Sequence, residues 1–307
     1  MTKQKLFKTT AALLFGVVLW VVLALFLASS DRQVARADPG TIYVDVDAPG
    51  TPDGLTWSTA FTNVQDALVA AVAGDDIWVA EGVYYPDEGS GQADDDRDST
   101  FQLKRGVALY GGFVGIETSL TERNWTTYVT VLSGDIDRND ATDAKGVVTD
   151  TNGIVGTNAY NVVTSQSVTE TAVLDGFTIT AGNADGGSCP GPWCGGGMLN
   201  YSDFGDNWAD PTVRHVVFSA NRTTGWGGGM YNANDADPVL VDVTFVGNSA
   251  YYGGGMANQY GSTPRLNGAT FEDNFATWGG GMYSEASSAI LTSTTFIGNT
   301  ASRGGGI

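Results

Sequence analysis

Two short motifs recur through the C-terminal half of the chain at an interval of about 26 residues. In the first, a phenylalanine is followed three positions later by an asparagine, with copies that start at Phe218, Phe245, Phe271 and Phe296. In the second, three glycines are followed by methionine or, once, by isoleucine, at 195–198, 227–230, 253–256, 279–282 and 304–307. A unit of this length is too short to bury its own apolar face. The period therefore predicts a repeat architecture in which the units stack on one another.

Other positions of the repeat align as well. An aliphatic residue stands five positions before each phenylalanine, at Val213, Leu240, Leu266 and Leu291. Short apolar runs separated by glycine, asparagine and proline predict strands joined by turns rather than helices. When the units stack at the spacing of hydrogen-bonded strands, like residues lie over like residues, and the glycines permit the tight turns. We therefore predict an all-β fold, a single-stranded parallel β-helix.

The N-terminal half predicts a cap for this stack. Residues 41–46 predict a first strand, and apolar residues then recur at helical spacing, which predicts a short amphipathic helix over 62–73. These apolar residues are Val64, Ala67, Leu68 and Ala71. An uncovered end of the stack would expose an edge that promotes aggregation, so a covering helix meets a physical need.

The paired motifs, over about residues 170–307, resemble the repeats of chlamydial polymorphic outer-membrane proteins. They are also similar to the broader pectate-lyase-like superfamily of right-handed parallel β-helices. The resemblance implies a right-handed coil and, because the chlamydial proteins are adhesins and autotransporters, a role at a surface. It is specific for the fold and weak for any activity.

The first 37 residues predict export. Three lysines precede an apolar run over 11–28, and Ala35-Arg36-Ala37 fits a cleavage site. We predict a signal peptide over 1–37, with an uncleaved N-terminal anchor as the alternative, because the apolar run is just long enough to span a bilayer. Both alternatives make the remainder a secreted, cell-surface or cell-envelope protein. Membrane contact is expected only through this segment or through a missing C-terminal part.

We divide the exported part into two regions. The cap and first coils are expected over 38–125, and the β-helix repeats over 126–307. The repeats stop inside a coil at Ile307, so we expect the C-terminal part of the β-helix to be incomplete.

The charge balance limits the partners of the chain. Asp and Glu number 34 against 15 Lys and Arg, which gives a net charge of −19. Such a surface repels nucleic acid, so no nucleic-acid partner is expected, and it offers oxygen ligands to Ca²⁺. The alternative is that the acidity only keeps an exported protein soluble.

Two acidic segments are candidates for calcium. In the first, oxygen-bearing residues alternate as in an EF-hand loop, at Asp135, Asp137, Asn139 and Asp143. The segment departs from that pattern at Asp140, where glycine is expected, and at Gly146, where a bidentate glutamate is expected. A solvated acidic turn is the alternative. The second candidate consists of Asp94, Asp95, Asp96 and Asp98.

Aromatic residues flank the glycine triplets. Trp226, Tyr252 and Trp278 precede three successive triplets, and Tyr231 and Tyr283 follow the methionine of two of them. An outward ladder of such rings could stack sugar rings and bind carbohydrate, or it could only support the turn. Upstream, Cys189 and Cys194 lie in Cys-Pro-Gly-Pro-Trp-Cys, and export favours a disulfide between them.

The sequence favours an exported β-helix with a structural or adhesive role that binds polysaccharide or a cell surface. A polysaccharide lyase or glycoside hydrolase that acts in a groove is the alternative, and a spacer is a third possibility. The sequence alone gives neither a carboxylate pair nor a calcium–arginine cluster for catalysis. His215 aligns with Asp242, Gly268 and Ser293, which is typical of an ordinary outward column.

Overall fold

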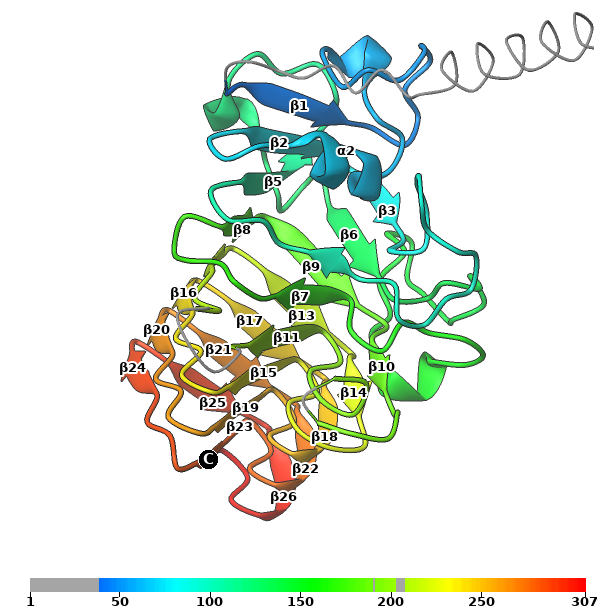
Figure 1. The fold of residues 1–307 in the computed structure, drawn as a ribbon. Helices are drawn as coiled ribbons and strands as arrows, with labels where there is room; N and C mark the ends of the chain where they lie inside the picture. Colours follow the sequence, from blue (N-terminus) through cyan, green and yellow to red (C-terminus); the bar gives the residue numbers. More distant parts are fainter. Residues whose placement is uncertain (1–38, 190, 203–207) are drawn as a thin grey trace, which may run out of the picture. The chain divides into compact units, whose positions relative to one another are not determined.

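The computed structural model describes residues 39–189, 191–202 and 208–307. Residues 38–307 form one compact unit, and the predicted signal peptide or anchor over 1–37 lies outside the described residues. Within the described ranges we find no helix that qualifies as a transmembrane span. The described residues form parallel β-sheets in which each strand lies beside a strand of a neighbouring coil (Figure 1).

Two long sheets run through the whole stack. Sheet 1 contains β1 (Thr41–Val44), β2 (Asp76–Ala80), β5 (Ala108–Phe113), β8 (Val173–Asp175), β12 (Thr212–Arg214), β16 (Val239–Val241), β20 (Arg265–Asn267) and β24 (Ile290–Thr292). Sheet 2 contains β3 (Gly82–Tyr84), β6 (Thr130–Ser133), β9 (Phe177–Thr180), β13 (Val217–Ser219), β17 (Thr244–Val246), β21 (Thr270–Glu272) and β25 (Thr295–Ile297).

Two shorter sheets complete the coils. Sheet 3 contains β4 (Phe101–Gln102), β7 (Val163–Ser165), β11 (Met198–Tyr201), β15 (Met230–Ala233), β19 (Met256–Gln259) and β23 (Met282–Glu285). Sheet 4 contains β10 (Asn183–Ala184), β14 (Arg222–Thr223), β18 (Ser249–Tyr252), β22 (Phe275–Trp278) and β26 (Thr300–Arg303). The helical elements are η1 (Trp57–Thr59), α2 (Val64–Ala70), η2 (Leu120–Glu122) and η3 (Thr151–Gly153).

Every pairing between neighbouring strands of these sheets is parallel. The chain passes through sheets 1, 2, 4 and 3 in turn before it returns to sheet 1, as β12, β13, β14 and β15 show. The prediction of an all-β parallel β-helix is confirmed. A right-handed coil is the hand that parallel crossover connections take in nearly all known cases.

The repeated phenylalanines form a single interior column. Phe218, Phe245, Phe271 and Phe296 are paired in register from coil to coil. Their ring centroids are 4.9, 4.7 and 4.8 Å apart, and the ring planes lie within 8° of parallel. The first three are fully buried. The stacking distance equals the strand spacing, so each ring is held at contact distance by the backbone register.

A ladder of buried asparagines runs beside the phenylalanine column. The backbone N–H and the Nδ2 of Asn221 both donate to Oδ1 of Asn248, at 2.9 and 3.1 Å. Asn248 makes the same two bonds to Asn274, and Asn274 makes them to Asn299. Each amide also donates to a carbonyl of the coil before, as Asn248 does to Phe218. These amides satisfy buried polar groups at the turn and fix the register.

The glycine triplets allow adjacent coils to approach closely. At Gly228 an added Cβ would lie 2.5 Å from the carbonyl oxygens of Gly254 and Ser249, so no side chain fits. Gly227 has a φ of 65°, the left-handed region that favours glycine. The repeat therefore needs glycine for both space and backbone conformation.

The predicted cap helix is present but shorter than expected. α2 begins after Asn63, whose side chain accepts from the backbone N–H of Asp66, and ends before Ala71, which is extended. The expected span of 62–73 is too long at the C-terminal end because Asp75 accepts from the N–H of Val72 and holds the chain in a turn. The helix buries Val64, Gln65, Ala67 and Leu68.

We expect Asn248→Ala to lower the free energy of unfolding by about 2–4 kcal/mol. The substitution leaves the buried N–H of Asn221 without its acceptor, at about 1–3 kcal/mol, and removes the hydrogen bonds that the Asn248 amide donates to Phe218 and Asn274, at about 1 kcal/mol. Urea denaturation measures the change. Asn267→Ala, at an exposed position of β20, is the control and should stay within about 0.5 kcal/mol of the wild type. Equal stability of the two variants would contradict a structural role for the ladder.

Candidate functional site

The five predicted carbohydrate-binding aromatics do form one cluster. Trp226, Tyr252 and Trp278 are paired in sequence along the edge of sheet 4. Trp226 stacks on Tyr252 with ring centroids 4.1 Å apart, and Tyr252 lies 6.5 Å from Trp278. Tyr283 packs against Tyr252 at 5.0 Å, and Tyr231 is buried beneath Trp226.

The packing of this aromatic cluster leaves little ring face for a ligand. Trp226 and Tyr252 cover each other, and the guanidinium of Arg303 lies 4.3 Å from the ring centre of Trp278. At the other end of the cluster, Cys189 and Cys194 form a disulfide, with Cα atoms 5.6 Å apart, that packs with Trp226. A sugar ring stacks on an open aromatic face, so this arrangement favours a supporting role for the cluster.

Most oxygens of the first acidic segment accept hydrogen bonds within the protein; the exception is Oδ1 of Asp137, which is buried and has no hydrogen-bond partner among the described residues. Asp135 accepts from the backbone N–H groups of Asn139 and Asp140, at 3.0 and 3.1 Å. Asp143 accepts from those of Lys145 and Val147. Among the described residues, the carboxylates of Asp135, Asp137 and Asp143 do not gather around a point that could hold a metal ion. The alternation of acidic residues here corresponds to carboxylates that cap turns.

Three carboxylates in this segment influence one another. Burial, together with the nearby charges of Asp135 and Asp137, raises the pKa of Asp140 to about 6. Hydrogen bonds to Asp140 from Val155 N–H, at 2.6 Å, and from Asn158 Nδ2, at 2.7 Å, oppose that shift. Burial also raises the pKa of Asp135.

The second acidic segment is only partly brought together. Carboxylate oxygens of Asp94 and Asp95 lie within 4.8 Å of one another and of an oxygen of Asp87, a residue that the sequence analysis did not single out. Asp96 instead accepts from the backbone N–H of Asp98, at 3.1 Å, in a local turn.

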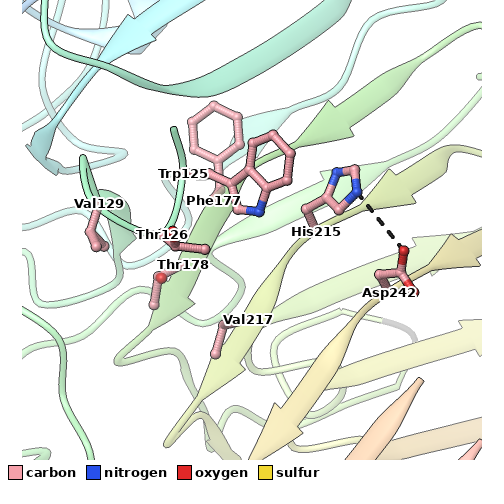
Figure 2. A pocket seen from close by; sticks show the side chains of 9 residues that line it. Trp125, Thr126, Val129, Phe177, Thr178, His215, Val217 and Asp242 are labelled. Carbon is pink, nitrogen blue, oxygen red and sulfur yellow. Dashed lines mark ion pairs between the residues drawn. The ribbon is translucent and has the colours of Figure 1, made fainter. Parts of the chain in front are cut away.

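A pocket lies outside the stack, over the turns that join sheets 1 and 2 (Figure 2). Its volume is about 360 Å³. Apolar side chains form part of its wall: Trp125, Val129, Phe177 and Val217. Polar side chains form the rest: Thr126, Thr178, His215 and Asp242. The sequence analysis missed this pocket.

A buried charge network lies beside the pocket. Asp175 Oδ1 accepts from Nδ1 of His215 at 2.8 Å and pairs with Nη2 of Arg123 at 2.9 Å. The side chains of Asp175 and Arg123 are only 6 and 7% exposed, so each charge needs the other. The bond to Asp175 orients the imidazole, and Nε2 is left 3.9 Å from a carboxylate oxygen of Asp242.

The loop that carries Arg123 and Trp125 is fastened over the turns by this network. The ring of Trp125 stacks on His215 with centroids 4.3 Å apart, and the guanidinium of Arg123 lies 4.7 Å from the Trp125 ring. His215 and Asp242 occupy equivalent turns with φ of 48° and 52°, one coil apart. The equivalent turn one coil earlier carries Gly176, also left-handed, so the side chain at this turn differs from coil to coil, and the loop and three such turns together line the pocket.

The signal for this pocket in the sequence is weak. Arg123 and Trp125 precede the repeats, and no repeat period relates them to His215. The one available hint is that the only histidine of the chain stands in a column otherwise occupied by Asp242, Gly268 and Ser293.

The raised pKa values predict a pH dependence of stability. The ordinary pKa of an aspartate is 3.8, so with a folded pKa of about 6 Asp140 binds its proton more tightly in the folded state. Stability is therefore lost as the pH rises between these two values. We expect a higher melting temperature at about pH 5 than at about pH 7.5. Thermal melts of Asp140→Asn should show a smaller difference, whereas the exposed Asp47→Asn should keep the wild-type difference. Identical pH profiles for the two variants would refute the assignment to Asp140.

No protein-family model and no curated protein matches the sequence. Among solved structures, the chain is similar to pectin methylesterase PemA from Erwinia chrysanthemi, at 12% sequence identity and a TM-score of 0.37. The match covers 77% of this chain and spans 56% of the length of the esterase chain. A likeness this distant carries no argument about substrate or activity.

Proposed function

We propose that this chain is an exported β-helix protein that binds polysaccharide at the pocket beside His215. The observation that carries the proposal is a pocket whose lining combines apolar side chains with four polar ones. A sugar presents apolar C–H faces and a rim of hydroxyl groups, and pockets of this composition are the usual sites of small polar ligands. The N-terminal 37 residues support export, and a surface location supports an adhesive or structural role.

The charge of the chain favours a neutral polysaccharide. The net charge is −19, and Asp242 at the pocket is 63% exposed in its side chain. The positive charge of Arg123 is already neutralised by Asp175. A polyuronate would meet a repulsive field, whereas a neutral glycan would donate its hydroxyls to Asp242 and His215 without that penalty.

We expect Asp242→Asn to weaken glycan binding by about tenfold or more, since a hydrogen bond to a charged group contributes about 1.5–3 kcal/mol. The measurement is retention on an array of β-glucans, mannans, galactans and polyuronates. Asp273→Asn is the matched control, because Asp242 and Asp273 both have left-handed turns and both lie against a glycine of the next coil. The control should bind as the wild type does.

The aromatic cluster provides a second arm of the same experiment. Trp278→Ala should lower the melting temperature and leave retention on the array unchanged. If Trp278→Ala loses retention while Asp242→Asn retains glycan as the wild type does, the sugar binds at the aromatic cluster and not at the pocket. Absence of retention on every glycan would refute the proposal.

A second candidate function is acid–base cleavage of a polysaccharide. The observation that favours it is the Asp175–His215 pair, in which a buried carboxylate orients an imidazole whose Nε2 lies beside the pocket. In a hydrolysis, Nε2 would take a proton from water as the water oxygen attacks, and would return it to the departing sugar oxygen. Thr126 and Thr178 supply hydroxyls at the pocket to orient the substrate.

We expect His215→Asn to abolish cleavage and to weaken glycan retention less than Asp242→Asn does, because it removes a hydrogen bond to a neutral group. Asparagine tolerates the left-handed φ of 48° and can still donate to Asp175, but it cannot carry a proton at the position of Nε2. The assay measures new reducing ends together with the absorbance of unsaturated products, which only a lyase generates. A variant that cleaves as fast as the wild type would exclude His215 as the acid–base group.

A further inference from the structure

The loop between β3 and β4 carries the densest group of acidic residues in the chain. Residues 87–98 contain six carboxylates, at Asp87, Glu88, Asp94, Asp95, Asp96 and Asp98, and one basic residue, Arg97. Within this loop, Asp87, Asp94 and Asp95 each offer an oxygen, and the three oxygens lie within 4.8 Å of one another.

Asp87 differs from the other two because it is buried. Its exposed fraction is 6%, whereas Asp94 and Asp95 are exposed. Its Oδ2 accepts from the backbone N–H of Asp95 at 3.2 Å. Its Oδ1 is buried and has no hydrogen-bond partner within the ranges that the structure describes. Buried carboxylates are normally paired, hydrogen-bonded or bound to a metal, and an unpartnered buried oxygen is unfavourable.

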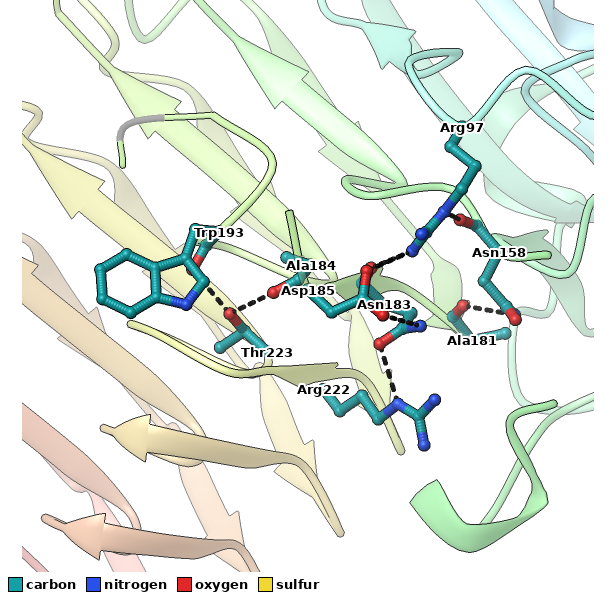
Figure 3. Close-up of polar contacts among 9 residues, drawn as sticks. All are labelled: Arg97, Asn158, Ala181, Asn183, Ala184, Asp185, Trp193, Arg222 and Thr223. Carbon is teal, nitrogen blue, oxygen red and sulfur yellow. Dashed lines mark hydrogen bonds and ion pairs between the residues drawn. The ribbon is translucent and has the colours of Figure 1, made fainter. Parts of the chain in front are cut away.

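The basic residues nearby are engaged elsewhere. Arg97 binds other groups: its Nε donates to the carbonyl of Asn158 at 2.7 Å, and its Nη2 pairs with Asp185 at 2.6 Å (Figure 3). Arg138 pairs with Glu88. In the part of the chain that the structure describes, no lysine or arginine forms an ion pair with Asp87, Asp94 or Asp95.

We propose that Asp87, Asp94 and Asp95 bind a calcium ion, with the unpartnered Oδ1 of Asp87 as the buried ligand. The chemistry of the site favours Ca²⁺, because all donors are hard carboxylate oxygens and the exposed side admits water ligands. Mg²⁺ demands a stricter octahedral geometry at shorter distances, which an exposed pair of surface carboxylates meets less well.

The ion would join the start of the β3–β4 loop, at Asp87, to the middle of the loop, at Asp94 and Asp95. Asp87 follows β3 closely, and the far end of the loop is already tied to the stack through Arg97. A cation between Asp87 and the pair Asp94–Asp95 would close the remaining span, so calcium would stabilise this loop independently of any glycan site.

Calcium binding to the full-length chain tests the proposal. Chelator-treated protein is titrated with CaCl₂ by calorimetry, and with Tb³⁺ by luminescence, for which Tyr85 beside Asp87 is a suitable antenna. We expect one site, with a dissociation constant of about 10⁻⁴–10⁻³ M, the range of extracellular calcium modules. Millimolar Mg²⁺ should not displace Tb³⁺. Absence of both a calcium heat and sensitised emission would overturn the proposal.

Variants locate the ion. Asp87→Asn and Asp94→Asn should each weaken binding at least tenfold. Asp98→Asn is the matched control, with the same charge change in the same loop, and should change the affinity by less than threefold. Because Asp94 is exposed, Asp94→Asn decides the result if Asp87→Asn fails to fold. Wild-type calcium affinity in Asp94→Asn would refute this site, and so would equal losses of affinity in all three variants. A fourth variant, Asp137→Asn, tests the other acidic segment, and loss of affinity in that variant alone would also refute the site.

Discussion

The hydrogen-bonded register between successive coils is the constraint on which the rest of the structure depends. Each strand pairs residue for residue with its counterpart one coil on, so a repeated side chain lies over its own copy. Phenylalanine rings then stack nearly parallel, and each asparagine amide bonds to the next. A slip of one residue would turn the phenylalanines outward and break the amide ladder together, which makes this register strongly specified.

The same constraint decides where function can be built. The interior is occupied by columns of like residues, so variable chemistry is confined to the turns and to the loops that cross them. The turn between sheets 1 and 2 keeps a left-handed residue in four successive coils, at His215, Asp242, Gly268 and Ser293. Its backbone stays the same while its side chain changes from imidazole to carboxylate to hydrogen. The pocket uses this freedom, because it is lined by Trp125 together with three such turns, at Gly176, His215 and Asp242.

Sequence alone could predict those features that the period repeats. The strands, the phenylalanine column and the glycine turns follow from local patterns that recur four or five times, and the cap helix follows from apolar spacing. The pocket could not be predicted, because Arg123, Trp125 and Asp175 meet His215 only through the order of the coils. Alternating acidic residues around Asp135 match a calcium loop in spacing, yet the same spacing serves carboxylates that cap turn N–H groups. Likewise, the aromatic columns were predictable, whereas the direction of the ring faces was not.

The acidic clusters of the N-terminal half illustrate two responses to one electrostatic problem. Carboxylates held close together repel, and folding must supply either a proton or a cation. At Asp140, burial and the nearby charges of Asp135 and Asp137 raise the pKa to about 6, against the opposing effect of the hydrogen bonds from Val155 and Asn158. Around Asp87 one oxygen has no donor and its partners face water, which leaves coordination sites for a cation. A proton and a cation would compete for the same oxygens there, so acidification would oppose the proposed binding of calcium.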